Sequence, residues 1–166
     1  MNVNWIAFPL HPETPEEGIT LETLFAGRPV DIPKMLDRLK ITAIQLKLPF
    51  GNRNMTFNSR LAQELGKWAE KKGRGDRFHQ RVFHAYFAEG INIAKPSSLL
   101  DICRQSGLDV NAAEVVIRER RFRDAVDKDW DLSRQAGITA VPTFVVGINR
   151  LVGAQPYRAL ENLLIS

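Results

Sequence analysis

Apolar residues recur every three to four positions through most of the chain between residues 31 and 136. This period places them on one face of a helix, and Gly, Pro, Asn and Asp residues interrupt it at intervals. The pattern therefore predicts a series of amphipathic helices separated by short loops. We expect helices at residues 21–25, 31–45, 58–72, 76–89, 96–106, 109–118 and 122–136, and a last one at 156–164.

Strand-like patterns lie at the two ends of this helical stretch. Residues 2–8 mix alternation with β-forming residues, and a segment rich in Pro and Gly follows, so we expect an opening strand there. Residues 143–146 and 150–152 are rich in β-branched residues, with turn-forming residues 147–149 between them. Two such runs around a Gly/Asn turn are typical of a β-hairpin. The sequence thus predicts an α/β protein.

Large aromatic residues within the predicted helices are expected to form the core. Trp68 and Trp130 fall on apolar faces, and the helix at 76–89 carries an aromatic stripe. At helical spacing such a stripe is typical of a core rather than of a cofactor site. Cys103 is the single cysteine of the chain and lies beside apolar helix positions. We therefore expect a buried structural thiol and not a reactive one.

Composition and charge exclude several classes of protein. With 44% hydrophobic and 25% charged residues, the 166-residue chain has the balance of one ordinary globular domain. The net charge is +4, but acidic residues closely follow the densest basic run, 118–123. This mixture favours a solvated helix face over a nucleic-acid site. Neither a membrane span nor a leader pattern is visible, so we expect a cytoplasmic protein without nucleic-acid or membrane partners.

The histidines and acidic residues do not have the spacing of a metal or acid–base site. His79 and His84 are five positions apart, whereas two ligands on the same helix face need an i, i+4 spacing. His11 and the glutamates within residues 13–17 lie in a predicted loop without a partner. We therefore expect no metal ion and no catalytic pair of carboxylates.

The segment from residue 137 to residue 156 carries a family signature. A helix ending at Gly137 is followed by Ala140-Val141-Pro142-Thr143-Phe144, the predicted hairpin and Gly153-Ala154-Gln155-Pro156. These features resemble the C-terminal half of the thioredoxin fold in its DsbA-like branch. In that fold the bond at Val141-Pro142 is cis, which exposes the backbone of the preceding residue to an incoming extended chain. The resemblance implies that Val141, Pro142 and Thr143 bind substrate.

Other stretches look like two particular relatives within that branch, the FrnE-like proteins and 2-hydroxychromene-2-carboxylate isomerase. They are Phe8 to Gly18, Asn52-Arg53-Asn54, Asn58 to Ala62 and His84 to Ile93. The resemblance covers essentially the whole chain. It implies a single thioredoxin-like domain over 1–166, with a helical insertion at 30–136 and a C-terminal ββα half at 137–166. Asn52, Asn54 and Asn58 are either residues of a polar substrate pocket or loop residues that cap the helix beginning at Asn58.

The sequence departs from these relatives at its beginning. They start with a strand, a Cys-Pro-x-Cys-type turn and a helix before the strand that matches residues 2–8, and these elements have no counterpart here. Dithiol exchange needs an attacking thiolate and a resolving partner. We therefore expect no catalytic residue and no dithiol activity in this polypeptide alone, unless a product that starts upstream supplies the pair. We also expect a homodimer that covers the sheet edge left open.

Three functions follow from the resemblance. The first is a protein of the thiol–disulfide oxidoreductase family that is inactive as given. The second is a non-catalytic module that binds extended peptides or assembles with them at the cis-proline loop. The third is a glutathione-linked isomerase of the 2-hydroxychromene-2-carboxylate type. Expected partners are an extended peptide or a small thiol, and glutathione is the one cofactor that stays open.

Overall fold

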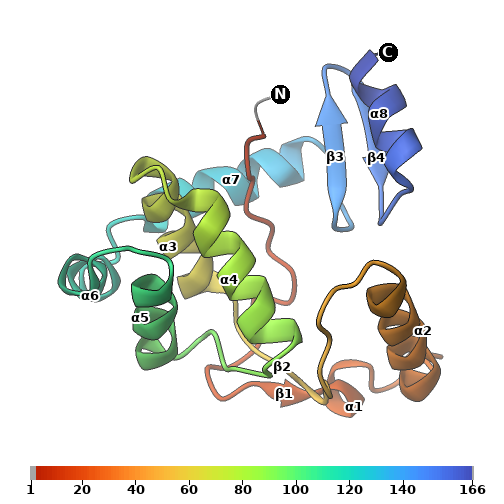
Figure 1. Ribbon diagram of the computed structural model, residues 1–166, viewed down its shortest axis with the longest axis horizontal. Coiled ribbons are helices and arrows are strands. Elements are labelled where there is room, and N and C mark those ends of the chain that lie inside the picture. Colours follow the sequence, from red (N-terminus) through yellow and green to blue (C-terminus); the bar gives the residue numbers. More distant parts are fainter. Residues whose placement is uncertain (1–2, 166) are drawn as a thin grey trace. The chain divides into compact units, whose positions relative to one another are not determined.

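The computed structural model describes residues 3–165 and shows a mixed α/β protein that is mostly helical (Figure 1). The predicted α/β class is confirmed, and so is each predicted helix, with ends that differ by no more than two residues. The elements are β1 (Ile19–Thr20), α1 (Leu21–Leu24), α2 (Ile32–Gln45), β2 (Met55–Thr56), α3 (Arg60–Lys71), α4 (Gly75–Phe87), α5 (Pro96–Gln105), α6 (Val110–Arg118), α7 (Arg123–Gln135), β3 (Thr143–Val146), β4 (Asn149–Val152) and α8 (Tyr157–Ile165).

The chain divides into two compact units. Of the described residues, 3–8 and 127–165 form one, which we call the hairpin unit because it contains β3 and β4. Pro9–Val126 form the other, the helical unit. Helix α7 begins in the helical unit and continues into the hairpin unit.

The helical unit is built around a closed apolar core between α3, α4, α5 and α6. Leu65, Phe78 and Leu99 are fully buried in it, and Trp68 is 5% exposed, as its position on the apolar face of α3 predicted. A residue with a positive φ ends helix α3. At the end of α3, Gly73 has a positive φ of 67°, and the next amide, that of Arg74, donates to the carbonyl of Ala69. This arrangement satisfies carbonyls that the last turn of a helix otherwise leaves open.

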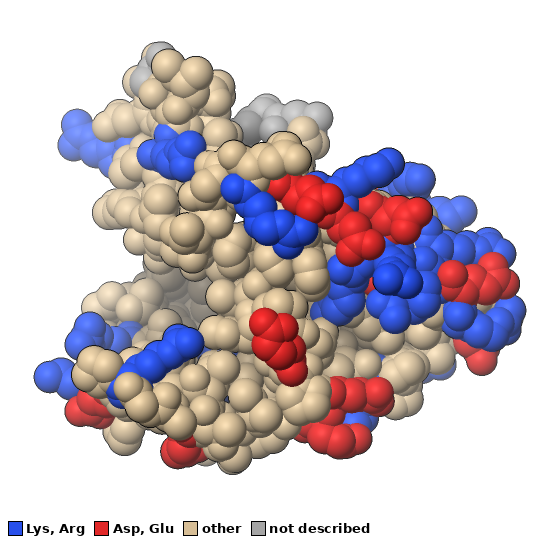
Figure 2. Space-filling view, turned by 180° about the vertical axis from the view of Figure 1, so that it is seen from behind, with Lys and Arg blue, Asp and Glu red and all other residues tan. Residues whose placement is uncertain are grey.

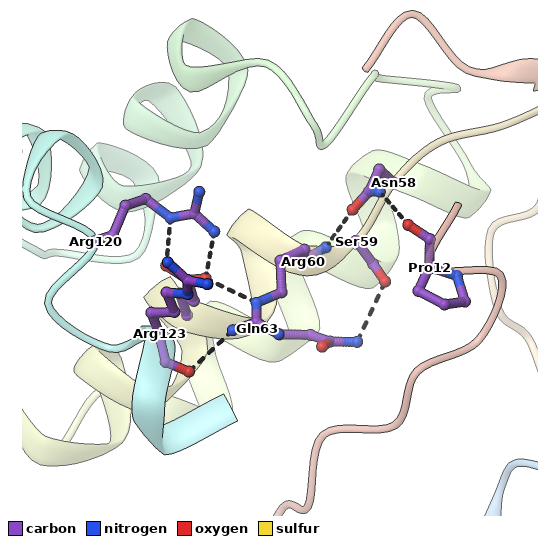
Figure 3. Close-up of polar contacts among 8 residues, drawn as sticks. Pro12, Asn58, Ser59, Arg60, Gln63, Arg120 and Arg123 are labelled. Carbon is purple, nitrogen blue, oxygen red and sulfur yellow. Dashed lines mark hydrogen bonds and ion pairs between the residues drawn. The ribbon is translucent and has the colours of Figure 1, made fainter. Parts of the chain in front are cut away.

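An ion cluster around Glu64 joins α3 to the turn before α7 (Figure 3). Glu64 is 1% exposed, and its Oε1 accepts hydrogen bonds from Arg60 Nε at 2.8 Å and from Arg120 Nη2 at 2.6 Å. Its Oε2 accepts a third from Arg120 Nε at 2.8 Å. Burial raises the pKa of this carboxyl, but the hydrogen bonds from Arg120 and Arg60 and their charges outweigh that effect and hold the pKa below 4.5. We call these three residues the Glu64 cluster.

Arg120 has an unusual backbone for its side chain. Its φ is 49°, in the left-handed region that favours glycine. It follows α6 at the position that Gly73 holds after α3, and its amide donates to the carbonyl of Ile117 while that of Arg121 donates to Val116. A non-glycine residue therefore ends α6 in the same way as a glycine ends α3.

A small sheet in the helical unit was not predicted. Ile19 pairs with Thr56 and Thr20 with Met55, in antiparallel register. The Thr20 side chain also caps α1, because its Oγ1 accepts the amide of Thr23 at 3.1 Å. Two-residue strands are too short for a periodic pattern to reveal them.

The predicted opening strand is wrong for the residues that the structure describes. Residues 3–9 form no strand, and residue 2 lies outside the described residues. The backbone of Ala7 bonds instead to side chains of α7: its amide donates to Asp129 Oδ2 at 2.8 Å, and its carbonyl accepts Ser133 Oγ at 3.3 Å. β-forming residues become a strand only where a neighbouring backbone pairs with them. In this segment the backbone groups of Ala7 bond to side chains and not to a neighbouring strand.

The hairpin unit contains the predicted hairpin. β3 and β4 pair from Thr143↔Val152 to Val146↔Asn149, so the turn is one residue shorter than predicted. Gly147 has a φ of 57°, as the first turn residue of a type II′ hairpin needs. Trp130, expected in a core, is only half-buried.

No helix within residues 3–165 is long and apolar enough to cross a membrane.

Candidate functional site

The loop before β3 holds three of the predicted site residues. The Val141–Pro142 peptide bond is cis, Val141 is 42% exposed, and Pro142 is also exposed. The loop is fixed from both sides, because the hydroxyl of Thr143 donates to the carbonyl of Ala140 at 2.6 Å and the amide of Gly153 donates to the carbonyl of Pro142 at 2.7 Å. Val141 is thus presented on a rigid turn.

The edge of β3 that faces away from β4 is open. In an antiparallel pair every second residue turns its N–H and C=O away from the partner strand. Since Pro142 bonds toward Gly153, the outward-facing residues are Val141, Thr143 and Val145. Within residues 3–165 the backbone groups of Val141 have no protein partner. An open edge of this kind is a template for another extended chain.

A cavity of about 400 Å³ in the helical unit holds two more predicted residues, Asn52 and Asn54. The cavity is lined by α1, α2 and residues 50–54. Two contacts hold these residues in place: the amide of Gly51 donates to the carbonyl of Phe87, and the carbonyl of Asn54 accepts the amide of Leu21. A Cβ at Gly51 would lie 2.2 Å from the carbonyl oxygen of Ala88, so only glycine fits at that close approach. We call this space the Arg53 cavity, after the residue between the two asparagines.

Arg53 lines the same cavity and was not predicted as a site residue. Its Nη2 donates to the hydroxyl of Tyr86 at 2.9 Å, and its guanidinium carbon lies 5.0 Å from the ring centre of Tyr86 and 5.3 Å from that of Phe87. Its Nε is buried and has no hydrogen-bond partner among residues 3–165. The sequence Asn52-Arg53-Asn54, with a cation between two amide side chains, could have indicated a polar site. The contacts of Arg53 with residues more than 30 positions later could not be predicted from the sequence.

Asn58 bonds to the backbone of two other segments (Figure 3). Its Nδ2 donates to the carbonyls of Pro12 at 3.0 Å and Thr14 at 2.7 Å, and its Oδ1 accepts the amide of Arg60 at 2.8 Å. These bonds tie the start of α3 to the backbone of the segment around Pro12. Asn58 thus bonds to backbone groups at the start of α3, whose N-cap residue is Ser59, and the lining of the Arg53 cavity does not include it.

The predicted site residues fall into three places. Asn52 and Asn54 line one cavity, whereas Asn58 lies at the start of α3; all three belong to the helical unit. Val141, Pro142 and Thr143 lie together in the hairpin unit.

Cys103 offers no reactive thiol. It is fully buried in the core of the helical unit, as predicted, and burial raises the pKa of its thiol to about 12. A protonated, enclosed thiol does not attack disulfides at neutral pH. Within residues 3–165 there is also no group of three His, Cys, Asp or Glu side chains that would hold a metal ion.

Comparisons with known proteins agree on one family. The sequence model of the DsbA-like thioredoxin domain matches residues 1–164. Among curated proteins, the uncharacterised protein YwbO of Bacillus subtilis is 32% identical over 95 residues, which is 57% of this chain and 48% of that protein. The match thus spans about half of that relative's length.

Solved structures show the same fold. A probable DsbA oxidoreductase of Streptomyces coelicolor is similar over 92% of this chain and 69% of its own, with a TM-score of 0.84 at 22% identity. A Nitrosomonas europaea protein provisionally assigned as a protein disulfide isomerase is similar over 82% of this chain and 73% of its own, with a TM-score of 0.66 at 16% identity. At these identities the likeness establishes a thioredoxin-like fold.

Proposed function

The chain belongs to the DsbA-like thioredoxin domain family, and from this premise we propose that it serves thiol–disulfide exchange as a substrate-docking component. It binds an extended, cysteine-containing polypeptide along the open edge of β3, beginning at Val141. The attacking thiolate comes from outside this sequence, whose single cysteine is Cys103. The observation that carries the proposal is the pair of free backbone groups of Val141 on a fixed, exposed turn.

Two features of the loop support docking of a chain rather than of a compact molecule. The free N–H and C=O groups repeat at every second residue from Val141 to Val145, which is the spacing of a strand partner. The side chain of Val145 is 57% exposed and that of Val141 42%, so apolar contacts add to the ladder. Strand addition of this kind takes its affinity from main-chain hydrogen bonds and its selectivity from alternate side chains.

The binding test uses peptides with single N-methyl groups. An unmodified cysteine-containing peptide is titrated into ¹⁵N-labelled protein, and we expect shifts of the amides of Val141, Thr143 and Val145. Methylation at the peptide nitrogens that face β3 should weaken binding about tenfold, since each removes a hydrogen bond and adds a clash. Methylation at the alternate nitrogens is the matched control and should have little effect. Equal losses at both sets of positions, or no shifts near Val141, would contradict the proposal.

The exchange test separates docking from chemistry. The chain alone should not reduce insulin or oxidise a dithiol peptide above the uncatalysed rate, because Cys103 is enclosed and protonated. The variant Cys103→Ala should behave in the same way. Turnover that disappears in Cys103→Ala would overturn the assignment of Cys103 as structural.

Two earlier expectations stay predictions. The glutathione-linked isomerase is tested by calorimetry with glutathione, where absence of heat would argue against it. The homodimer is tested by light scattering at micromolar concentration, where a monomeric mass would argue against it.

A further inference from the structure

We propose that the Arg53 cavity binds a carboxylate carried on an apolar group, with Arg53 as the residue that pairs with it. The cavity lies wholly within the helical unit, so the proposal does not depend on docking at β3.

Arg53 forms no ion pair with a carboxylate among residues 3–165. Its side chain is nevertheless half-buried. Its one hydrogen bond goes to the neutral hydroxyl of Tyr86, and its buried Nε has none. Arginine is rarely withdrawn from water without a paired acid, because the charged group loses hydration that a neutral partner restores only in part. An anion in the cavity would supply the missing partner.

The guanidinium is held in place before any ligand arrives. Tyr86 and Phe87, neighbours at the end of α4, place their rings 5.0 and 5.3 Å from its central carbon. The hydroxyl of Tyr86 is itself fixed by Thr56 Oγ1 at 3.0 Å. A cation fixed by aromatic rings loses little freedom on binding an anion, and this lowers the entropic cost of association.

The lining of the cavity suits an apolar body. Its apolar walls come from three parts of the helical unit, namely Leu21 of α1, Ile32, Pro33 and Leu36 of α2, and Phe50 before the asparagines. A volume of about 400 Å³ is in the range of small-molecule sites. The amide side chains of Asn52 and Asn54 add donors beside Arg53.

The charged side chains at this cavity limit the ligand to low negative charge. Lys40 is a second cation without an ion-pair partner in the described residues. Glu22 and Asp37 also line the cavity, and both are exposed. Their negative charge weakens the attraction of Arg53 and Lys40 for an anion and disfavours a ligand with more than one negative charge. A monocarboxylate with an aromatic or aliphatic group therefore fits better than a phosphate or a dicarboxylate.

The test compares benzoate with benzamide, which has the same shape and no charge. We expect benzoate to shift the amide resonances of Gly51 to Asn54 saturably, and benzamide to bind at least tenfold more weakly, because a charge-assisted hydrogen bond is about twice as strong as a neutral one. Arg53→Gln should abolish the preference for benzoate, while Arg53→Lys should keep part of it. Equal binding of the two probes, or shifts that miss residues 51–54, would overturn the proposal.

Two variants keep the test decisive if Arg53→Gln fails to fold. Lys40→Gln should weaken benzoate binding a few-fold, and Glu22→Gln should strengthen it by a similar factor, since both charged side chains line the cavity. An unchanged affinity in both variants would contradict a charge-governed site. A peptide that ends in phenylalanine, with a free or an amidated C-terminus, identifies the source of the carboxylate. If the free form binds more tightly than benzoate, the ligand is a chain terminus. If it binds more weakly, the ligand is a free acid.

Discussion

The core of the helical unit and the surface of the hairpin unit are built on opposite principles. In the first, Leu65, Phe78 and Leu99 are fully enclosed, and even the buried carboxylate of Glu64 has its partners. In the second, Val145 and Val152 are at least half exposed, and β3 has an open edge. Surface charge also differs on the face drawn in Figure 2: charged side chains of both signs crowd over α6 and α7, whereas the surface around β3, β4 and α8 is mostly uncharged.

The contrast separates stability from recognition. A two-stranded hairpin has little stability of its own, whereas a packed helical core holds itself together. Residues of the helical core should therefore govern the free energy of unfolding, and residues of the hairpin should govern binding. Four substitutions test this division.

The largest effect is expected at Phe78, whose side chain is fully buried between the helices. Phe78→Ala should lower the free energy of unfolding by about 3–5 kcal/mol, because it removes apolar contacts and leaves a cavity. Urea denaturation followed by far-UV circular dichroism measures it. A loss below about 1 kcal/mol would mean that the core is far looser than its burial indicates.

The next effect is expected at Glu64. Glu64→Gln should lower the free energy of unfolding by about 2–3 kcal/mol, since it leaves the guanidinium groups of Arg120 and Arg60 without their anion. The loss is smaller than for a fully buried pair because the side chain of Arg120 is 47% exposed. Glu119→Gln, in an exposed cluster with Arg118 and Arg121, is the matched control and should be close to neutral.

The same carboxylate predicts a dependence on pH. Because the pKa of Glu64 is lowered in the folded state, its contribution to stability is present above about pH 4.5 and is lost as the pH falls toward the folded pKa. The wild-type protein should lose more stability than Glu64→Gln between pH 5 and 3. Parallel curves for the two proteins would show that the cluster does not titrate in this window.

A smaller loss is expected at Cys103. Cys103→Ser should cost about 1–2 kcal/mol, because it places a hydroxyl among apolar side chains, and peptide binding should be unchanged. Labelling with a thiol reagent checks the enclosure: the native thiol should react only as fast as the protein opens. Rapid labelling of the native wild-type protein would contradict the raised pKa and the burial.

The smallest effect is expected at Val145. Val145→Thr should change the free energy of unfolding by less than about 0.5 kcal/mol, as is usual for surface positions. A cost above about 1 kcal/mol would show that the exposed face of β3 is covered in solution, in line with the predicted homodimer. Concentration-dependent unfolding would then identify a second copy as the cover.

The success of sequence reasoning differed between elements for physical reasons. The helices were predictable because apolar residues recur along them with the helical period, and the hairpin because Gly147 marks its turn. The opening strand failed because pairing depends on a neighbour, and the two-residue strands β1 and β2 are too short to carry a pattern.

The candidate site was only partly readable. Val141 to Thr143 were identified through a resemblance, and in the structure they form the loop that leads into β3, while their role in binding stays a prediction. Arg53 was missed because its burial depends on Tyr86 and Phe87, far along the chain. Glu64 could have been noticed, since an acid between Leu61, Leu65 and Trp68 on an apolar helix face needs a partner. Its partner Arg120 could not have been identified from spacing.

The backbone of Arg120 restricts how this region can change in evolution. Glycine would relieve the positive φ, but it would remove both hydrogen bonds to Glu64 and leave a buried acid with only Arg60. A glycine at position 120 thus becomes acceptable only after Glu64 has been replaced by a neutral residue. In homologous sequences we expect the two positions to change together, with an acid at 64 paired with arginine at 120 and a neutral residue at 64 paired with glycine.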